Sequence, residues 1–306
     1  MRYGKLAPLI ACVAFLIACY LLYRALSGYD RANIVEAVFA VTGARLALGA
    51  LFVAASYFAL TLFDALALRY IEAKLPYRRV ALASFTALSI GHTLGVAAAS
   101  SGAVRYRFYS RWGLGAGDIA RIILFCATTV LLGLNTLAAF TLLFQASAAS
   151  TLPGLSRSGV IILGLACFLL TALYVALAAL LKEPLKLQRW EIPIPPVKLA
   201  LAQVAVGTIN FGLVAAALYT LLPGTVVGGY VAVATVYVLA NAASIASHVP
   251  GGLGVLEAVV IHAVPELSVV GALVVFRFLY FLVPFTAGAA LFAIYELAQR
   301  RRGSVR

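Results

Sequence analysis

The chain has 306 residues, of which 64% are hydrophobic and only 11% are charged. Soluble domains carry about 25% charged residues, so this composition excludes an ordinary soluble protein and predicts an all-α polytopic membrane protein. The net charge is +13, but the basic residues stand in short clusters at the ends of apolar runs. This pattern indicates membrane orientation and contact with anionic phospholipid, and we expect no nucleic-acid partner.

Apolar runs of about 20 residues are long enough to cross a bilayer. The chain has about six runs that we interpret as full spans, at about 6–26, 46–68, 119–144, 158–181, 199–221 and 269–298. The first run is long for a cleaved signal peptide, so we interpret it as an uncleaved span. Between the first two runs, residues 30–44 predict an amphipathic helix at the membrane interface.

Two further apolar segments contain residues that break helices. Residues 80–104 carry no formal charge but include Gly91, Gly95 and Gly102, and residues 226–266 are interrupted by a Pro-Gly-Gly sequence. Such breaks free backbone groups, which are costly in hydrocarbon. Each segment therefore either crosses the bilayer fully or forms a broken hairpin that enters and leaves on one side.

The distribution of Lys and Arg decides between these alternatives. With the N-terminus in the cytoplasm, a full crossing at 80–104 would place Arg105, Arg107 and Arg111 outside. A hairpin keeps them inside, and a second hairpin at 226–266, open to the outside, returns the C-terminus to the cytoplasm. Most of the 23 basic residues then face the cytoplasm. The sequence thus predicts two re-entrant hairpins with both termini cytoplasmic.

Each half of the chain then has the order span, span, hairpin, span, with opposite starting sides. A short similarity supports this order, because Ser89 and His92 in the first hairpin correspond to Ser244 and His248 in the second. Inverted repeats with paired broken helices point to a transport site at the bilayer midplane, although so short a match also arises by chance. The predicted organisation is one transmembrane domain, 1–306, with two half-repeats at 1–150 and 151–306.

Ionisable side chains at bilayer depth cost about 2.5–3.5 kcal/mol to insert and are candidates for function. Asp64 lies near the inner end of the second run, where an interfacial acid is the alternative interpretation. Arg277 lies in the last span, and Glu257 follows the Pro-Gly-Gly break by one turn, so these two either pair together or bind substrate groups. His92 and His248 lie at the two breaks, where a structural role is the alternative.

The most basic segment follows the first hairpin. Arg105, Arg107 and Arg111 are suited to bidentate contacts with phosphate. Free backbone amides of Ser101 and Gly102 at a broken helix end would add partial positive charge. We interpret this segment as an anion site, with a basic interfacial loop anchored by aromatic residues as the alternative.

The sequence contains no HExxH, GxSxG or P-loop motif. We therefore expect no enzyme activity, no cofactor and no metal site. The function that fits best is a phospholipid flippase or lipid transporter. Two alternatives stay open: a transporter of polyprenyl phosphate or a small anion, and a membrane enzyme or synthase partner acting on a lipid head group.

Two motifs together resemble a known family. The segments Ser101–Gly113 and His248–Glu257 are similar to the flippase-type transmembrane domain of the lysylphosphatidylglycerol synthetase/flippase proteins and their stand-alone relatives. The resemblance covers nearly the whole chain. It implies a multi-pass protein of the bacterial inner membrane that moves phospholipid, often aminoacylated phosphatidylglycerol, between leaflets.

The resemblance also implies a substrate role for the arginines of the first motif and for the Pro250–Glu257 segment. Bifunctional members carry a soluble synthase domain that this sequence lacks, so we expect no synthase activity, and a homo-oligomer or a separate synthase protein stays open as a partner. The predicted substrate-binding residues are Asp64, His92, Ser101, Gly102, Arg105, Arg107, Arg111, His248, Gly251, Gly252, Glu257 and Arg277.

Overall fold

Helices make up nearly all of the described chain. The computed structural model describes residues 31–94, 97–145, 156–181, 185–187, 190–192, 194–222, 228–247, 252, 254–264 and 267–303. In chain order, the elements are α2 (Arg31–Phe39), α3 (Gly43–Tyr70), α4 (Tyr77–Leu94), α5 (Ala97–Arg111), α6 (Ala116–Phe144), α8 (Arg157–Leu180), β1 (Leu185–Leu187), β2 (Trp190–Ile192), α9 (Val197–Leu221), α10 (Gly229–Ser247), α11 (Val255–Ala263), α12 (Leu267–Arg277), the π-helical η2 (Phe278–Leu282) and α13 (Val283–Gly303).

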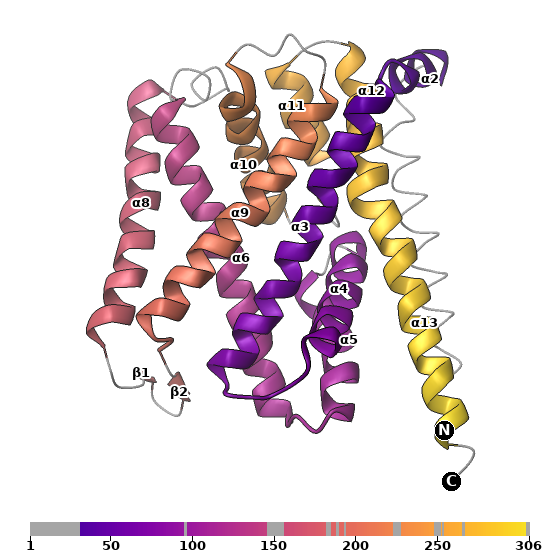
Figure 1. The fold of residues 1–306 in the computed structure, drawn as a ribbon. Helices are drawn as coiled ribbons and strands as arrows, with labels where there is room; N and C mark the ends of the chain where they lie inside the picture. Colours follow the sequence, from indigo (N-terminus) through magenta and orange to yellow (C-terminus); the bar gives the residue numbers. More distant parts are fainter. Residues whose placement is uncertain are drawn as a thin grey trace.

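The predicted polytopic helical fold is confirmed. Five helical segments in the described residues are long and apolar enough to cross a bilayer: Gly43–Tyr70, Ala116–Phe144, Arg157–Leu180, Val197–Leu221 and Val269–Gln299. Each agrees within a few residues with a predicted span. The predicted first span, 6–26, lies outside the described residues. Figure 1 shows the long helices running between two ends of the molecule, with α2 lying across the upper end as the interfacial prediction requires.

A short strand pair joins α8 to α9 at the lower end in Figure 1. Strands β1 and β2 pair antiparallel, with Lys186 opposite Glu191. The sequence predicted only a connector in this region, because strands of three residues leave no recognisable pattern of alternation.

Helix α3 is the centre of the packing. It packs against α9 and also contacts α4, α6 and η2. Helices α6 and α9 cross closely at two glycines, where a Cβ atom on Gly207 would lie 2.5 Å from the carbonyl oxygen of Thr129 and one on Gly133 would overlap the backbone of Gly207. Small residues at such crossings allow membrane helices to approach, because lipid provides no hydrophobic force between them.

The first predicted hairpin is formed by α4 and α5. Both helices occupy the lower half of the molecule in Figure 1, and they pack on each other. Helix α4 ends at Leu94 and α5 begins at Ala97, and the predicted break at Gly95 lies outside the described residues. Gly91 and Gly102 were wrongly predicted to break the helix: Gly91 lies within α4, and Gly102 lies within α5, where a Cβ would come within 3.2 Å of the Ile123 side chain on α6.

The second predicted hairpin is formed by α10 and α11, which lie in the upper half of the molecule in Figure 1. Helix α11 has 9 residues and is too short to cross a bilayer. In the turn before it, Gly252 and Gly254 have φ angles of 59° and 81°, in the left-handed region that favours glycine. A Cβ on Gly252 would also lie 2.6 Å from the hydroxyl oxygen of Ser244. The two hairpins thus lie at opposite ends of the molecule in Figure 1.

Basic residues gather at the lower end of Figure 1, where α3, α5 and α13 end and where α4, α6 and α9 begin. This group includes Arg69, Lys74, Arg78, Arg79, Arg107, Arg111, Arg121 and Lys198. This segregation is what the charge distribution predicted. That this end faces the cytoplasm, and that the halves of the chain are repeats, stay predictions.

Candidate functional site

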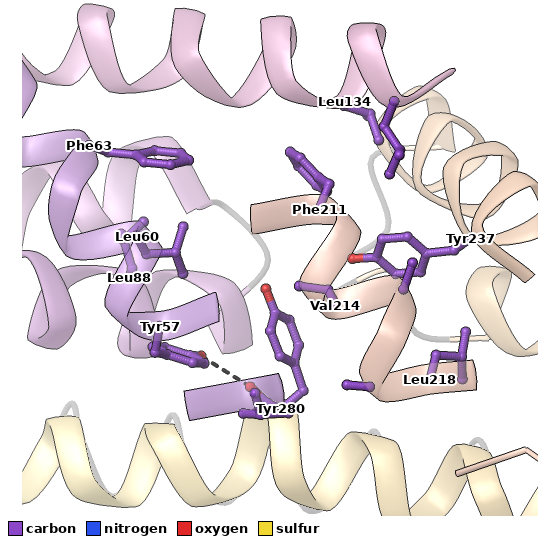
Figure 2. Packing of buried hydrophobic residues seen from close by; sticks show 14 of the residues in the cluster. Tyr57, Leu60, Phe63, Leu88, Leu134, Phe211, Val214, Leu218, Tyr237 and Tyr280 are labelled. Carbon is purple, nitrogen blue, oxygen red and sulfur yellow. Dashed lines mark hydrogen bonds between the residues drawn. The ribbon is translucent and has the colours of Figure 1, made fainter. Parts of the chain in front are cut away.

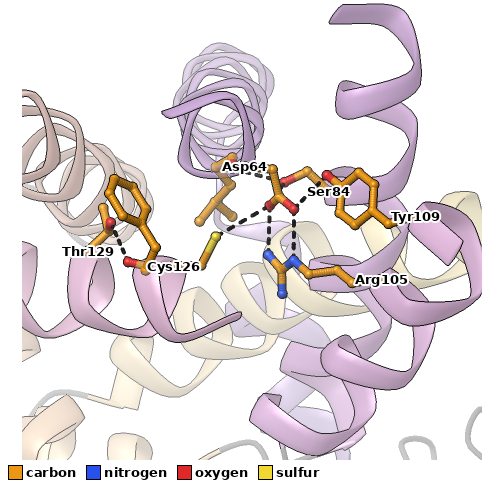
Figure 3. A network of polar contacts seen from close by, with 8 residues as sticks. Asp64, Ser84, Arg105, Tyr109, Cys126 and Thr129 are labelled. Atoms are coloured by element: carbon orange, nitrogen blue, oxygen red, sulfur yellow. Dashed lines mark hydrogen bonds and ion pairs between the residues drawn. The ribbon is translucent and has the colours of Figure 1, made fainter. Parts of the chain in front are cut away.

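A buried carboxylate joins the first hairpin to the rest of the protein (Figure 3). Asp64 on α3 accepts hydrogen bonds from Nε of Arg105 at 2.9 Å and from Nη2 of Arg105 at 2.7 Å. Ser84 of α4 donates to the same carboxylate at 2.7 Å, and Tyr109 of α5 donates at 2.9 Å. Sγ of Cys126 on α6 lies 3.8 Å from Oδ2. The carboxylate therefore connects α3, both hairpin helices and α6.

This cluster corrects the alternative of an interfacial acid at Asp64, because that side chain has no exposed surface. The bidentate capacity predicted for Arg105 is directed at a protein carboxylate here, and its contact with phosphate stays a prediction. Arg105 is 2% exposed and makes a bidentate ion pair, so it does not face solvent in this conformation. Removing one partner of a buried ion pair typically costs about 3–5 kcal/mol, so this pair fastens the hairpin to α3.

Two further arginines on α5 bind one carboxylate on α13. Arg107 donates to Glu296 through Nε at 3.0 Å and Nη2 at 3.1 Å. Arg111 donates to the same carboxylate through Nη1 at 2.8 Å and Nη2 at 3.1 Å. We call these three residues the arginine clamp. The prediction that Arg107 and Arg111 can hold an oxyanion in bidentate contacts fits this geometry, with a protein carboxylate in the place of the anion.

Glu296 was missed by the sequence reasoning. A signal was present, because an acid inside the apolar run 269–298 is a candidate by default. Its side chain is 8% exposed, which shows that it does not lie in water at the end of the span. Its partner Arg111 is 185 positions away, so no local pattern connects them.

A matching ion pair joins the second hairpin to the last span. Arg277 at the end of α12 donates to Glu257 of α11 through Nε at 2.6 Å and Nη2 at 3.0 Å. Nη2 of Arg277 also donates to the carbonyl oxygen of Gly252 at 3.0 Å, and Glu257 accepts the backbone N–H of Gly254 at 2.9 Å. The guanidinium lies 4.5 Å from the ring centre of Phe281. Of the two predicted alternatives, the structure shows pairing within the protein.

The first hairpin ends beside the π-helical segment of the last span. The ring of His92, in the last turn of α4, lies 6.0 Å from the ring of Tyr280 and 6.3 Å from that of Tyr57. Nδ1 of His92 is buried and has no hydrogen-bond partner within the described part of the chain. Figure 2 shows the Tyr280 side chain between residues of α3 on one side and of α9 on the other. His92 thus lies in an aromatic centre between the spans.

The remaining predicted residues fall into two groups. Ser101 and Gly102 lie in the second turn of α5, so their amides are not the free donors of a broken helix end. That expectation was wrong because α5 begins at Ala97, before them. His248 and Gly251 lie outside the described residues, so their predicted role is not addressed.

A pocket of about 520 Å³ lies at the basic end, where α3 meets α4. Its lining contains two basic side chains, Arg69 and Lys74, next to mostly apolar residues. The lining residues are Ala65, Leu68, Arg69, Ala73, Lys74, Leu75, Pro76, Tyr77 and Val80. Neither cation has an ion pair among the described residues, and this combination of charge and apolar surface is suited to an amphipathic ligand. The sequence did not single out this pocket.

The chain is similar to two proteins over most of its length, whereas no protein-family model matches it. It is 31% identical to the uncharacterised protein slr0712 of Synechocystis sp., over 97% of this chain and 94% of that protein. It is 30% identical to the inner membrane protein YbhN of Escherichia coli, over 80% of this chain and 78% of YbhN. Together with the five apolar spans, these similarities identify an integral membrane protein. The chain belongs to the family of the inner membrane protein YbhN.

Proposed function

We propose that this protein moves phospholipids between the leaflets of a bacterial inner membrane. The observation that carries the proposal is the pair of helical hairpins that lie at opposite ends of the molecule, each held by a bidentate arginine–carboxylate pair. Broken helices in such an arrangement are typical of transporters whose substrate site lies at the midplane. Ionisable residues within membrane spans are rare, pair with one another and mark substrate pathways in many transporters.

The two ion pairs provide the groups that a phospholipid head group needs. An arginine released from its carboxylate binds the phosphate, and the carboxylate binds an ammonium group of an aminoacylated or amine-bearing head group. Arg105 with Asp64 would serve one leaflet, and Arg277 with Glu257 the other. Exchange of partners keeps every charge paired, so that no isolated ion is left in the low-dielectric interior.

An aromatic centre lies at the tip of the first hairpin in this conformation. Tyr57, His92 and Tyr280 pack around the tip of the first hairpin. We propose that movement of this tip opens the passage, with the basic end facing the cytoplasm. The proposal assigns no catalytic reaction to the chain, and it takes aminoacylated phosphatidylglycerol as the first lipid to test.

Reconstituted vesicles test the proposal. Purified protein is placed in vesicles with a trace of head-group-labelled phosphatidylglycerol, lysylphosphatidylglycerol or phosphatidylcholine, and a membrane-impermeant quencher reports the label in the outer leaflet. Without lipid movement, the quencher reaches only the label in the outer leaflet, about half of the total. For the anionic or aminoacylated lipid we expect a larger quenched fraction, and we expect Arg277→Gln to return it to the outer-leaflet value. Arg121→Gln is the matched control, because Arg121 is exposed and its ion pair within the described part of the chain is the 3.6 Å contact with Asp118.

The outcome against the proposal is quenching limited to the outer leaflet for all three lipids. Movement of a short-chain polyprenyl phosphate between leaflets, without movement of any phospholipid, would favour the alternative substrate class instead. Turnover of the head group by the purified protein, followed by mass spectrometry, would point to an enzyme.

A further inference from the structure

The arginine clamp carries unbalanced charge. Arg107 and Arg111 place two guanidinium groups on the single carboxylate of Glu296. The side chain of Arg79 adds a third cation nearby, 5.9 Å from the ring centre of Trp112. An arrangement that served only to hold α5 against α13 would need one arginine. The excess positive charge therefore indicates a site for a second anion.

The exposed surface of the clamp belongs to its arginines. The side chains of Arg107 and Arg111 are 48% and 28% exposed, whereas that of Glu296 is 8% exposed. A guanidinium has five N–H donors. Each arginine gives two nitrogens to Glu296, and no other acceptor for either is found among the described residues. Donors that Glu296 does not use are thus left on two partly exposed side chains.

Aromatic side chains line the clamp. The ring centre of Tyr295 lies 5.7 Å from the guanidinium of Arg111 and 4.5 Å from the ring centre of Phe108. Trp112 packs on Phe108 at 5.4 Å. Phe108 is fully buried, so the aromatic surface open to a ligand comes from Tyr295 and Trp112, which are partly exposed. Such rings beside an oxyanion site at a membrane surface suit a ligand that is anionic at one end and apolar at the other.

We propose that the arginine clamp binds the phosphodiester of an anionic phospholipid, and that Glu296 holds the place of the phosphodiester oxygens in the unloaded protein. A carboxylate and a phosphodiester both offer two oxygens to the fork of a guanidinium. The inference rests on the proposed function, since it identifies the group by which the lipid is first captured at the basic end. When the lipid binds, it competes with Glu296 and loosens the contact between α5 and α13.

Quenching of Trp112 fluorescence measures this binding without any transport. The chain has two tryptophans, so a Trp190→Phe background leaves Trp112 as the reporter. The purified protein in neutral detergent is titrated with phosphatidylglycerol that carries brominated acyl chains. Glu296→Gln is expected to tighten binding about tenfold and Arg107→Gln with Arg111→Gln to weaken it about tenfold, the change that about 1.4 kcal/mol produces.

Matched controls and a second ligand make the test decisive. Asp118→Asn and Arg121→Gln remove an exposed ion pair at the same end, 3.6 Å long, and are expected to leave binding unchanged. If Glu296→Gln does not yield folded protein, Arg107→Lys with Arg111→Lys keeps the charge but removes the bidentate geometry, and is expected to weaken binding. Displacement of the lipid by inorganic phosphate would show a site for free phosphate and overturn the proposal.

Three further results would also overturn it: equal quenching by brominated phosphatidylcholine, a titration unaffected by the clamp variants, and weaker binding in Glu296→Gln. Failure here is distinct from failure of the proposed function. Lipid that binds at the clamp but stays in its leaflet argues against transport alone, and lipid that moves without any effect of the clamp variants argues against the clamp alone.

Discussion

The hydroxyl group of Tyr57 donates a 3.0 Å hydrogen bond to the main-chain carbonyl oxygen of Tyr280 (Figure 2). The bond joins the central helix α3 to the π-helical segment of the last span. A π-helical turn widens the backbone and is frequent at functional sites. The same rings pack on His92 at the tip of the first hairpin, so the bond lies where the hairpin, α3 and the last span meet.

Removal of this hydroxyl tests whether the π-helical segment must be held in place. We expect Tyr57→Phe to lower the free energy of unfolding by about 1 kcal/mol, because a buried carbonyl oxygen loses its side-chain donor. We expect lipid movement in the vesicle assay to fall by a larger factor than stability accounts for. Tyr219→Phe on α9 is the control, since Tyr219 is 40% exposed. Unchanged lipid movement in Tyr57→Phe would exclude a role for this contact in transport.

The buried pair of Asp64 and Arg105 allows folding and transport to be separated. Asp64→Asn leaves the guanidinium of Arg105 without its ionic partner, and we expect a loss of about 3–5 kcal/mol in the free energy of unfolding, measured by thermal unfolding in detergent. The double variant Asp64→Leu with Arg105→Met removes both charges and should recover most of that stability. We expect it to remain inactive in lipid movement.

The exposed pair of Asp118 and Arg121 is the control for this comparison. Its side chains are 45% and 55% exposed, so Asp118→Asn should cost no more than about 1 kcal/mol. Wild-type lipid movement by the uncharged double variant would contradict a role for the Asp64–Arg105 pair in binding substrate.

Local composition and charge predicted the spans and the hairpins, but they did not predict the ion pairs between residues far apart in the sequence. The span predicted at 46–68 is α3, Gly43–Tyr70, because hydropathy is a property of neighbouring residues. The hairpin at 80–104 followed from the placement of Arg105 and its neighbours. The partners of these arginines lie far away in sequence, Asp64 at 41 positions from Arg105 and Glu296 at 189 from Arg107. One sequence offers no means to choose them.

The role of glycine was also hard to predict from the sequence alone. The sequence predicted that Gly102 breaks a helix, yet Gly102 lies inside α5 and allows Ile123 of α6 to approach. Propensity identifies glycine as a weak helix former, whereas close packing of membrane helices requires small residues within helices. Whether a glycine ends a helix or allows close packing depends on the neighbouring helix, and the sequence of one segment does not reveal that neighbour.

The crossing of α6 and α9 provides a packing test. In Gly207→Ala, the new methyl group would meet the backbone of Thr129 and Gly133, neither of which can move as a side chain does. We expect a loss of about 1–3 kcal/mol in the free energy of unfolding, measured by thermal unfolding in detergent. Gly117→Ala on α6 is the control, because a Cβ there would meet nothing within 4 Å, and it should be neutral or slightly stabilising. Equal stability of the two variants would mean that α6 and α9 do not cross this closely in the membrane.

Cysteine labelling on intact cells tests which end faces the cytoplasm. In a chain whose four native cysteines are replaced by alanine, Tyr106→Cys places a thiol on the exposed face of α5 at the basic end, where the native side chain is 53% exposed. Gly43→Cys places one at the opposite end, at the start of α3.

Because basic residues are retained on the cytoplasmic side, we expect a membrane-impermeant maleimide added outside to label Gly43→Cys only. Tyr106→Cys should react only after the membrane is opened. Labelling of Tyr106→Cys alone would invert the orientation, and labelling of both from outside would mean that α4 and α5 do not form a re-entrant hairpin in the cell.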